Sequence, residues 1–295
     1  MVKPAARAAT EIRRDAFTGL TAGLRSAFAF VSNRQQFARK MSRLRHKALP
    51  AVGMGLLLLA AWYGAILLFG ISPFLLPAPH DVLAACWEER DSLISAGLIT
   101  GLHAIVGFCL AVSGGFVLSV PMSLFGLFRR AAYPWVTALQ MVPVITLIPI
   151  LVRWFDYGMG SVAAITFLIS FFPVVVNTTT GLLNVPRDFL DLFRLNGASR
   201  WQELWQLRVP NSLPYFMAGV RIAATLAPIG ALTGDLFAGS VGPDSGLGYL
   251  VQLYQGEGAI NSVFAVVLFS SLLGFAFVAT VLFISGRITR RRPSR

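Results

Sequence analysis

Six long apolar blocks constrain this chain more than any other feature of its sequence. They hold few charged residues and lie at about 49–70, 94–118, 131–152, 160–183, 213–236 and 262–286. About 20 residues, each rising 1.5 Å, cross the roughly 30 Å hydrocarbon core of a bilayer. Because backbone polar groups in lipid must be satisfied within their own segment, each block is expected to be a helix. The sequence therefore predicts an all-α integral membrane protein with six transmembrane helices.

The charges alternate between the connections that join these blocks. Eleven Lys and Arg precede the first block, and four Arg lie in the segment 184–212. The connection 71–93 is mainly acidic, and 237–261 contains no Lys or Arg. Connections rich in Lys and Arg stay on the cytoplasmic side of a membrane. The pattern therefore predicts that both termini are cytoplasmic, and it accounts for the net charge of +12 without a nucleic-acid partner.

The same pattern divides the chain into four parts. They are a basic cytoplasmic N-terminal segment (1–48), a first transmembrane helix with an extracytoplasmic loop (49–93), a core of five helices that includes the segment 184–212 (94–287), and a basic cytoplasmic tail (288–295). The first part is expected to lie on the anionic inner leaflet, or to form a loosely ordered tail. The leaflet interpretation rests on apolar residues at helical spacing: Phe17, Leu20, Leu24, Phe28 and Val31.

Prolines and polar residues inside the blocks indicate a candidate path across the membrane. Three prolines in 131–152 are expected to bend that span, and helices bent near the membrane centre commonly line a cavity. Polar side chains in spans are costly and default to functional candidates, although they also bond back to their own helix or tie helices together. The candidates for the path are Gln140, Met141, Thr146, Asn177 and Thr225.

His103 and Asp235 are ionisable residues that lie inside or at the end of a block. His103 is about ten residues into the second block, where it is expected to make an interhelical hydrogen bond or, alternatively, to carry a proton. Asp235 ends the fifth block at the predicted outer mouth. We expect it to serve as an extracytoplasmic gate or a contact for a binding protein. The alternative is an interfacial carboxylate in water.

The segment 184–210 is the longest charged run inside the chain. A helix is predicted to start at Asp188, to stop at Gly197 and to resume at Trp201. Such a segment is too polar to enter lipid. It fits an element that a partner protein grips. Arg194 and Arg200 would then face acids of the partner, and Trp201 and Trp205 would pack beneath the segment. The alternative is an amphipathic linker that lies on the lipid headgroups.

This segment resembles the EAA loop of bacterial ABC importer permeases. The loop has the pattern Glu-Ala-Ala, three residues, Gly, nine residues, Ile, one residue, Leu, Pro. Residues 191–193 occupy the Glu-Ala-Ala places, with larger residues at both alanines, and Gly197, Leu207, Val209 and Pro210 keep the remaining spacing. LLPAPHDVLAA, FFPVVVNTTTGLLNVP and SGLGYLV, in that order, are similar to the nitrate/sulfonate/taurine branch of these permeases.

The resemblance implies a permease subunit of the type I importer fold in a bacterial inner membrane. Two copies, or one copy and a paralogue, would form the translocation pathway. Two cytosolic ATPase subunits would each grip one coupling loop, and an extracytoplasmic binding protein would deliver the solute. The residues that the resemblance assigns to ATPase docking are Asp191, Arg194, Gly197, Ala198, Arg200, Leu207 and Pro210.

The chain itself offers no site for ATP or a metal. It lacks the GxxxxGK[ST] phosphate loop, and its lysines are Lys3, Lys40 and Lys47. Cys86 and Cys109 lack metal-ligand spacing and are expected to be unpaired thiols. ATP and Mg would therefore be bound by the partner ATPase, and this chain would not be an enzyme.

The solute and the energy source have alternatives. The branch takes up sulfonates, nitrate, taurine, pyrimidine vitamin precursors and flavin-like compounds. The lack of a span-centred Lys or Arg favours a neutral solute, or one bound through helix ends and hydroxyls. An ion-gradient-driven secondary transporter is the competing function. Such transporters tend to carry internal repeats and intramembrane carboxylates. Here no repeat is visible and no acid lies at the middle of a span.

Overall fold

The computed structural model describes residue 50 and residues 52–242 and 244–290, apart from the side chains of 288–290. The regular elements within these ranges are helices. The chain divides into two compact units at Ile71 and Ser72. The helix Val52–Phe69 belongs to the first unit, and none of its residues is buried. The amphipathic segment predicted within 1–48, and most of the predicted tail 288–295, lie outside the described residues.

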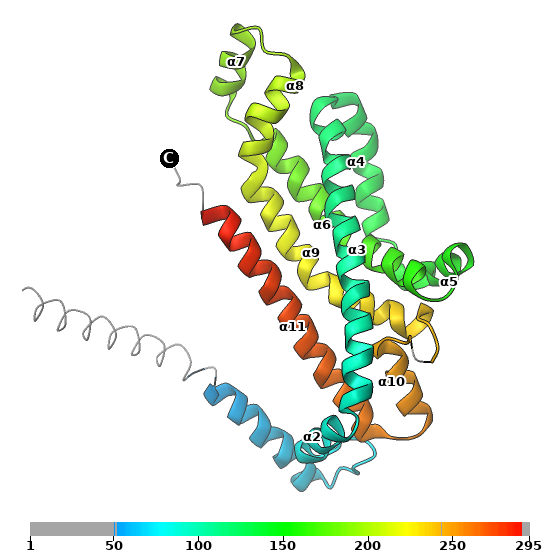
Figure 1. Ribbon diagram of the computed structural model, residues 1–295. Helices are drawn as coiled ribbons and strands as arrows, with labels where there is room; N and C mark the ends of the chain where they lie inside the picture. The colour runs from blue at the N-terminus through cyan, green and yellow to red at the C-terminus, as the bar shows by residue number, and fades with distance from the viewer. Residues whose placement is uncertain (1–49, 51, 243, 291–295) are drawn as a thin grey trace, which may run out of the picture. The chain divides into compact units, whose positions relative to one another are not determined.

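Eleven helical elements of the second unit follow in order within the described residues (Figure 1). They are α2 (Pro79–Glu88), α3 (Arg90–Leu124), α4 (Gly126–Gln140), α5 (Val144–Phe155), α6 (Met159–Leu183), α7 (Arg187–Leu195), α8 (Arg200–Gln202), the π-helix η1 (Glu203–Arg208), α9 (Val209–Ala238), α10 (Leu247–Gly256) and α11 (Ile260–Arg290), of which α8 is a single turn. We call the end of this unit that carries α7 and α8 the α7 end, and the end that carries α2 and α10 the α10 end.

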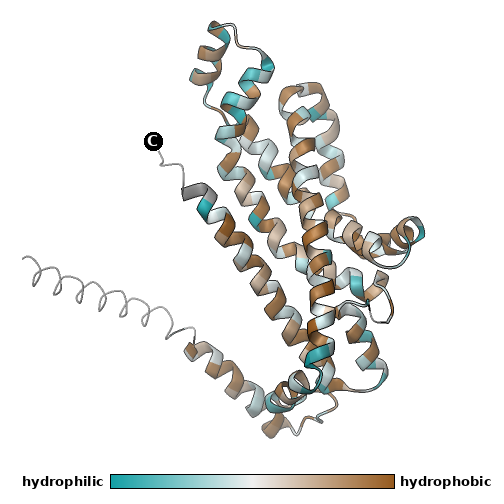
Figure 2. Cartoon of the chain, in the orientation of Figure 1, coloured by the Kyte–Doolittle hydropathy of each residue, from teal (hydrophilic) through white to brown (hydrophobic). Residues whose placement is uncertain are grey.

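Five helices in the described residues are long and apolar enough to cross a membrane, and a sixth span is present if the bent pair α4 and α5 counts as one. This confirms the all-α class with membrane-spanning helices. Apolar residues run along α3, α6, α9 and α11, whereas α8 and its surroundings are hydrophilic (Figure 2). The polar segment therefore lies beyond the apolar length of the long helices.

The predicted bend in the third span is confirmed, and it is larger than a kink. Helices α4 and α5 meet at an angle of 100° across the break 141–143. Pro143 is the N-cap of α5. Its ring cannot donate a backbone hydrogen bond and clashes with the preceding turn, so α4 ends before it. Pro134 and Pro149 lie inside α4 and α5 without interrupting them.

Small residues bring α3, α6 and α9 close together. A methyl group added to Gly107 of α3 would overlap Thr166 of α6, and one added to Gly234 of α9 would overlap Val162 of α6. In lipid there is little hydrophobic drive between helices, so close backbone approach supplies the packing. These contacts pack α3, which contains the second apolar block, closely against α6.

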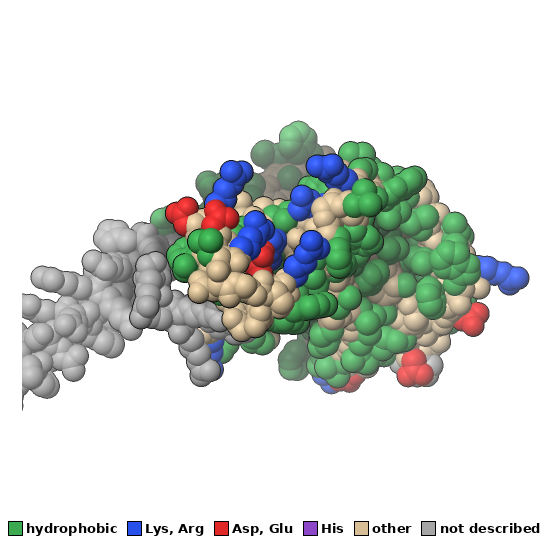
Figure 3. All heavy atoms as spheres, turned by 90° about the horizontal axis from the view of Figure 1, so that it is seen from above, with side chains coloured by type: hydrophobic (Ala, Val, Ile, Leu, Met, Phe, Trp, Pro, Cys, Tyr) green, Lys and Arg blue, Asp and Glu red, His purple; other side chains and the backbone are tan. Residues whose placement is uncertain are grey.

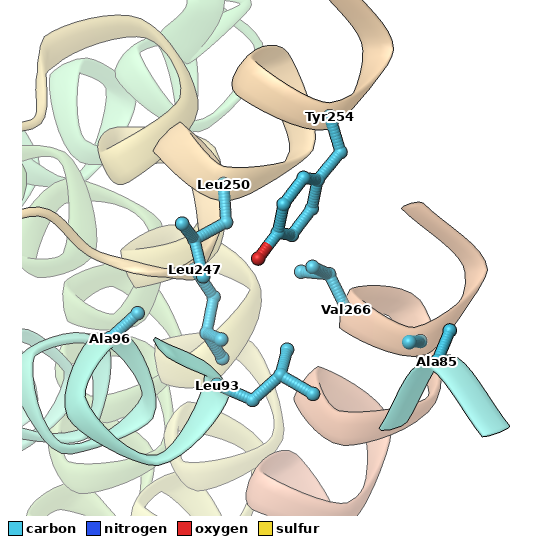
Figure 4. Packing of buried hydrophobic residues seen from close by; sticks show 8 residues of the cluster. Ala85, Leu93, Ala96, Leu247, Leu250, Tyr254 and Val266 are labelled. Carbon is cyan, nitrogen blue, oxygen red and sulfur yellow. The ribbon is translucent and has the colours of Figure 1, made fainter. Parts of the chain in front are cut away.

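A separate apolar cluster holds the α10 end together. Leu93 of α3, Leu247 and Tyr254 of α10, Val266 of α11 and Ala85 of α2 belong to it (Figure 4). Leu93 and Leu247 are almost fully buried. Because four helices contribute, none of them can shift at this end without disturbing the other three.

Candidate functional site

The charged segment forms a helix, a turn and a second helix, as predicted. Helix α7 begins at Arg187 after Pro186, and Asp188 lies in its first turn, where a carboxylate complements the helix dipole. After Leu195 the backbone turns at Gly197, whose φ is 72°. Glycine adopts this left-handed conformation without strain, which explains its place between the two helices.

The second helix is capped at one end and widened at the other. Ser199 forms a capping box with Gln202, and this starts α8. The chain then passes through the π-helical turn Glu203–Arg208 before α9 begins. Pro210 lies in the first turn of α9, where its missing N–H costs no hydrogen bond.

Large apolar side chains of this segment are exposed. The exposed fraction is 54% for Phe189, 86% for Leu195, 60% for Trp201 and 55% for Trp205. The expectation that Trp201 and Trp205 pack beneath the segment is therefore wrong. Leu204, which lies in the π-helical turn, takes the buried position instead. Exposed apolar groups of this kind mark a surface that another molecule covers.

The structure divides the predicted docking residues into two groups. Asp191, Arg194, Gly197 and Arg200 are exposed at the α7 end, and Figure 3 shows that basic side chains gather there among apolar ones. Ala198 is half-buried and lines a hollow between α7 and α8 that Gly197 also borders. Leu207 and Pro210 are half-buried at the junction with α9. The first group can be reached by a partner protein, and the second connects the segment to the long helices.

The predicted path residues occupy three separate places. Gln140, Met141 and Thr146 are exposed around the break between α4 and α5. Asn177 of α6 donates to the Pro173 carbonyl of its own helix at 2.7 Å and lies against Gly219 of α9. Thr225 of α9 is exposed.

Thr225 and Asn177 thus differ in their surroundings. Thr225 lines a hollow between α9 and α11, together with Ser270 and Ser271. It also donates to the Ile222 carbonyl of its own helix at 2.7 Å. Both Asn177 and Thr225 therefore donate a hydrogen bond to a backbone carbonyl of their own helix.

Asp235 is the centre of a buried polar cluster at the α10 end. Its Oδ1 lies 2.6 Å from Nδ1 of His103, and its Oδ2 accepts from the Thr100 hydroxyl at 2.5 Å. The Leu247 N–H donates to Thr100 Oγ1 at 2.8 Å. A methyl group at Gly246 would overlap the carboxylate. The cluster therefore joins α3, α9 and the start of α10.

Burial corrects one interpretation of Asp235 and supports one of His103. Asp235 is only 2% exposed, so it is not an interfacial carboxylate in water, and its side chain cannot touch a binding protein while it is enclosed. His103 makes the expected interhelical hydrogen bond. Thr100 and the Leu247 N–H were missing from the sequence prediction, because only the tertiary structure brings residues so far apart in sequence together.

A second acid–base cluster was also missed. Glu203 in the π-helical turn is 6% exposed and pairs with Arg208. The two residues lie five positions apart, a spacing that does not bring side chains together in an α-helix. In the sequence, the only indication of this pair was that Glu203 and Arg208 carry opposite charges. Both lie in the segment 184–210, whose charged residues were expected to contact a partner protein.

The comparisons with known proteins agree with this arrangement. Residues 107–291 match the family described as binding-protein-dependent transport system inner membrane component. The chain is 36% identical over 237 residues to the formylaminopyrimidine transport permease protein ThiX of Halalkalibacterium halodurans, which covers 80% of this chain and 93% of the relative. It is 32% identical over 212 residues to the riboflavin transport system permease protein RibX of Chloroflexus aurantiacus, covering 70% and 78%.

A more distant relative and two solved structures extend the comparison. The nitrate import permease protein NrtB of Leptolyngbya laminosa is 25% identical over 221 residues, covering 71% of this chain and 78% of the relative. The fold is that of the inward-facing MetNI methionine ABC transporter (TM-score 0.56, 18% identity, 69% of this chain and 97% of that one). It is also that of an amino acid ABC transporter (TM-score 0.55, 12% identity, 71% and 98%).

These matches settle the choice between an importer subunit and an ion-gradient-driven transporter. The matched family covers well over half of the chain and includes the charged segment 184–212. Its description requires a binding protein, and an ABC permease works with an ATPase. The chain belongs to the binding-protein-dependent inner membrane components: it is the permease subunit of an ABC importer, and the ATPase of that importer is a separate subunit.

Proposed function

We propose that the α7–α8 segment docks the ATPase and that the α7 end faces the cytoplasm together with both termini. The exposed apolar side chains Phe189, Leu195, Trp201 and Trp205 carry this proposal. Helix α7 has nine residues and none of them is buried. A helix this short is marginally stable alone, so a groove on a partner that covers its apolar side would stabilise it.

The rest of the transporter follows from this docking. Two ATPase subunits bind ATP and Mg, and each grips one α7–α8 segment. A second permease, either another copy or a paralogue, completes the pathway. Gln140, Met141, Thr146, Asn177 and Thr225 remain our candidates for residues that meet the solute. The division of the chain at residues 48, 93 and 287 remains our proposal for its functional parts.

Gly197→Asp tests the docking. A charged side chain would enter the hollow beside Ala198, so the ATPase should no longer co-purify with the permease, while the permease remains in the membrane. Gly197→Asn is the matched control, because it carries the same left-handed backbone strain, about 1–2 kcal/mol, without the charge. Co-purification of the ATPase with the Asp variant at the wild-type level would contradict the docking assignment.

Cysteine labelling tests the orientation. In a background with Cys86→Ser and Cys109→Ser, Leu195→Cys is expected to react with an impermeant thiol reagent only from the cytoplasmic side. Asp244→Cys is expected to react only from outside. Both positions are exposed in the permease alone, so the permease is labelled without its ATPase and a lack of reaction would reflect sidedness rather than burial. The reverse labelling would overturn the proposed topology.

Asp235 is proposed as part of the outer gate. Its carboxylate ties α9 to Thr100 and His103 of α3, and Gly246 holds α10 against it. A path that opens on the outer side has to separate these helices or move them as one body. Asp235 would then control the gate through the helices that it joins, and a binding protein would act on the surface above it.

A small neutral heterocycle of the pyrimidine class is the proposed solute. Two relatives above 30% identity are permeases for formylaminopyrimidine and riboflavin, whereas the nitrate permease is 25% identical. The candidate path residues supply neutral amide and hydroxyl groups, which can bond to ring nitrogens and carbonyls. A sulfonate or nitrate would need a cation or helix end instead.

Uptake by cells tests the solute class. A deletion strain should lose uptake of labelled formylaminopyrimidine and regain it when this chain is expressed with its ATPase and binding protein. Excess riboflavin, nitrate and taurine serve as competitors. Competition by nitrate or taurine, with no uptake of the pyrimidine, would place the solute among the anions instead.

A further inference from the structure

Arg208 connects three parts of the molecule at the α7 end. Its Nε donates to Glu203 Oε1 at 2.7 Å, and its Nη2 donates to the same oxygen. Its Nη1 donates to the Ser123 carbonyl at 3.2 Å and lies 3.5 Å from the Leu182 carbonyl. Ser123 is in the last turn of α3, and Leu182 is in the last turn of α6.

The two carbonyls are natural partners for a guanidinium. The last turn of a helix leaves carbonyl groups without intrahelical donors and carries the negative end of the helix dipole. The guanidinium of Arg holds five N–H donors in a rigid planar fork that reaches acceptors on several sides, whereas Lys has three donors on a single nitrogen. Arg208 therefore fastens the end of α3 and the end of α6 to the segment that precedes α9.

The π-helical turn makes this arrangement possible. In an α-helix, residues five positions apart point about 140° away from each other. In a π-helix the backbone hydrogen bond runs from residue i to i+5, so Glu203 and Arg208 lie one turn apart on the same side. A regular α-helix here would turn the carboxylate away from the guanidinium.

Glu203 extends the connection to α7. Its Oε2 lies 3.7 Å from Nε of Arg194, which belongs to α7 and is 60% exposed. The Glu203 side chain itself is 8% exposed and that of Arg208 13%. A continuous set of ionic contacts thus runs from the exposed helix α7, through Glu203 and Arg208, to the ends of two long helices.

We propose that Glu203 and Arg208 are positioning residues that transmit movement of the α7–α8 segment to α3 and α6. This inference rests on the proposed docking of the ATPase to α7 and α8. The pair does not bind the ATPase, since it is buried beneath the exposed face. It makes the segment and the two helix ends move as one body when the ATPase moves.

Distance measurements by electron paramagnetic resonance in the permease–ATPase complex test whether Glu203 and Arg208 connect α7 to the end of α3. We call this pair of residues the joint. Nitroxide labels are placed at Asp188→Cys in α7 and Phe125→Cys next to the end of α3, in the background without native cysteines. Both positions are exposed, and neither is among the proposed docking side chains. The wild-type joint should give one narrow distance distribution, both without nucleotide and with Mg–ATP trapped by vanadate. Arg208→Gln should broaden or shift the distribution after trapping, while the ATPase still co-purifies.

Two further variants keep the test decisive. Arg187→Gln is the matched control, because Arg187 is an exposed arginine of the same segment outside the joint, and it should behave as wild type. Arg208→Lys keeps the charge but not the fork, so it should fall between wild type and Arg208→Gln. It replaces Arg208→Gln if that variant does not fold.

Three results would overturn the proposal. The first is an Arg208→Gln distribution that stays as narrow as wild type after trapping. The second is a wild-type distribution that changes on trapping as much as the variant does. The third is an Arg208→Lys protein that also fails to fold, which would assign the pair to stability alone. Failure of the docking proposal is distinguishable, since wild type and Gly197→Asp would then bind the ATPase equally.

Discussion

Asp235 at the α10 end and Glu203 at the α7 end are both buried acids that meet a basic side chain, but they are held differently. All described partners of Asp235, namely Thr100, His103 and the helix start beside Gly246, are buried themselves. In Glu203, Oε1 pairs with the largely buried Arg208, whereas Oε2 pairs with the exposed Arg194.

The difference teaches what each end can do. A carboxylate enclosed on all sides fixes three helices relative to one another. A carboxylate that also reaches an exposed helix connects a mobile partner to the helices instead. Helix α3 takes part in both: Ser123 and His103 are 20 residues apart, which is about 30 Å of helix. Movement imposed at one end of α3 can therefore reach the other.

The strongest test of this comparison is Asp235→Ala. It leaves His103 buried without its partner, leaves Thr100 only the Ala96 carbonyl as acceptor, and opens a cavity. It should therefore lower the free energy of unfolding by about 3–5 kcal/mol. Unfolding in detergent–lipid micelles measures the change. Asp244→Ala, at an exposed acid of the neighbouring loop, is the control and should stay within about 0.5 kcal/mol of wild type. Equal effects of the two variants would show that the cluster of Asp235, Thr100 and His103 does not stabilise the α10 end.

Gly248→Ala tests the tight packing of α10 against α9 beside Asp235. A methyl group there would overlap the backbone of Leu232 and Leu236, which cannot rotate away as a side chain can. Overpacking of this kind costs about 1–3 kcal/mol. Gly256→Ala, in the same helix but in open space, should be neutral or stabilising by up to about 1 kcal/mol, because alanine favours helix. Thermal unfolding of both variants measures the contrast.

Glu203→Gln is expected to have a smaller effect on stability than Asp235→Ala. The amide keeps a hydrogen-bond acceptor for Arg208, and the Ser123 carbonyl still accepts from the guanidinium. A cost of about 1–2 kcal/mol follows from losing charge-assisted hydrogen bonds. The measurement is again unfolding in micelles. A loss of unfolding free energy as large as that of Asp235→Ala would mean that both acids serve mainly to stabilise the fold. The distinction between the Asp235 cluster and the Glu203–Arg208 pair would then fail.

Tyr254→Phe gives the smallest effect and a pH dependence. Burial, and then the 2.7 Å hydrogen bond that the phenol donates to Glu89, raises the pKa of Tyr254 from 10.0 to about 12. The folded state favours the neutral phenol, so its stabilisation is complete below pH 10 and is lost as the pH rises through 12. The Phe variant should be about 1 kcal/mol less stable at neutral pH.

Alkaline unfolding separates Tyr254 from its neighbours. The Phe variant should lose the part of the pH dependence between 10 and 12 that wild type shows. Tyr249→Phe, at a half-buried tyrosine in the same helix, is the control and should retain it. An unchanged alkaline profile in Tyr254→Phe would show that this phenol does not support the packing of α10 against α2.

Much of the architecture was accessible from the sequence because lipid restricts the choices. An uncharged block of 20 residues is expected to be a helix there, and the three prolines of 131–152 predicted a bend without showing which of them would make it. The two-helix form of 184–210 followed from Pro186 and Gly197, whose backbone preferences are local. The sequence also placed His103 in an interhelical hydrogen bond.

The sequence by itself determined the membrane helices, the polar segment between them and the family, because periodicity, turn residues and motif order are properties of neighbouring residues. Only the tertiary structure decided that Asp235 is enclosed by Thr100 and His103, that Trp201 and Trp205 face outward, and that Arg208 holds two helix ends. The physical reason is that each of these depends on helix rotation, on one π-helical turn, and on contacts between residues many positions apart. Local patterns do not encode such contacts.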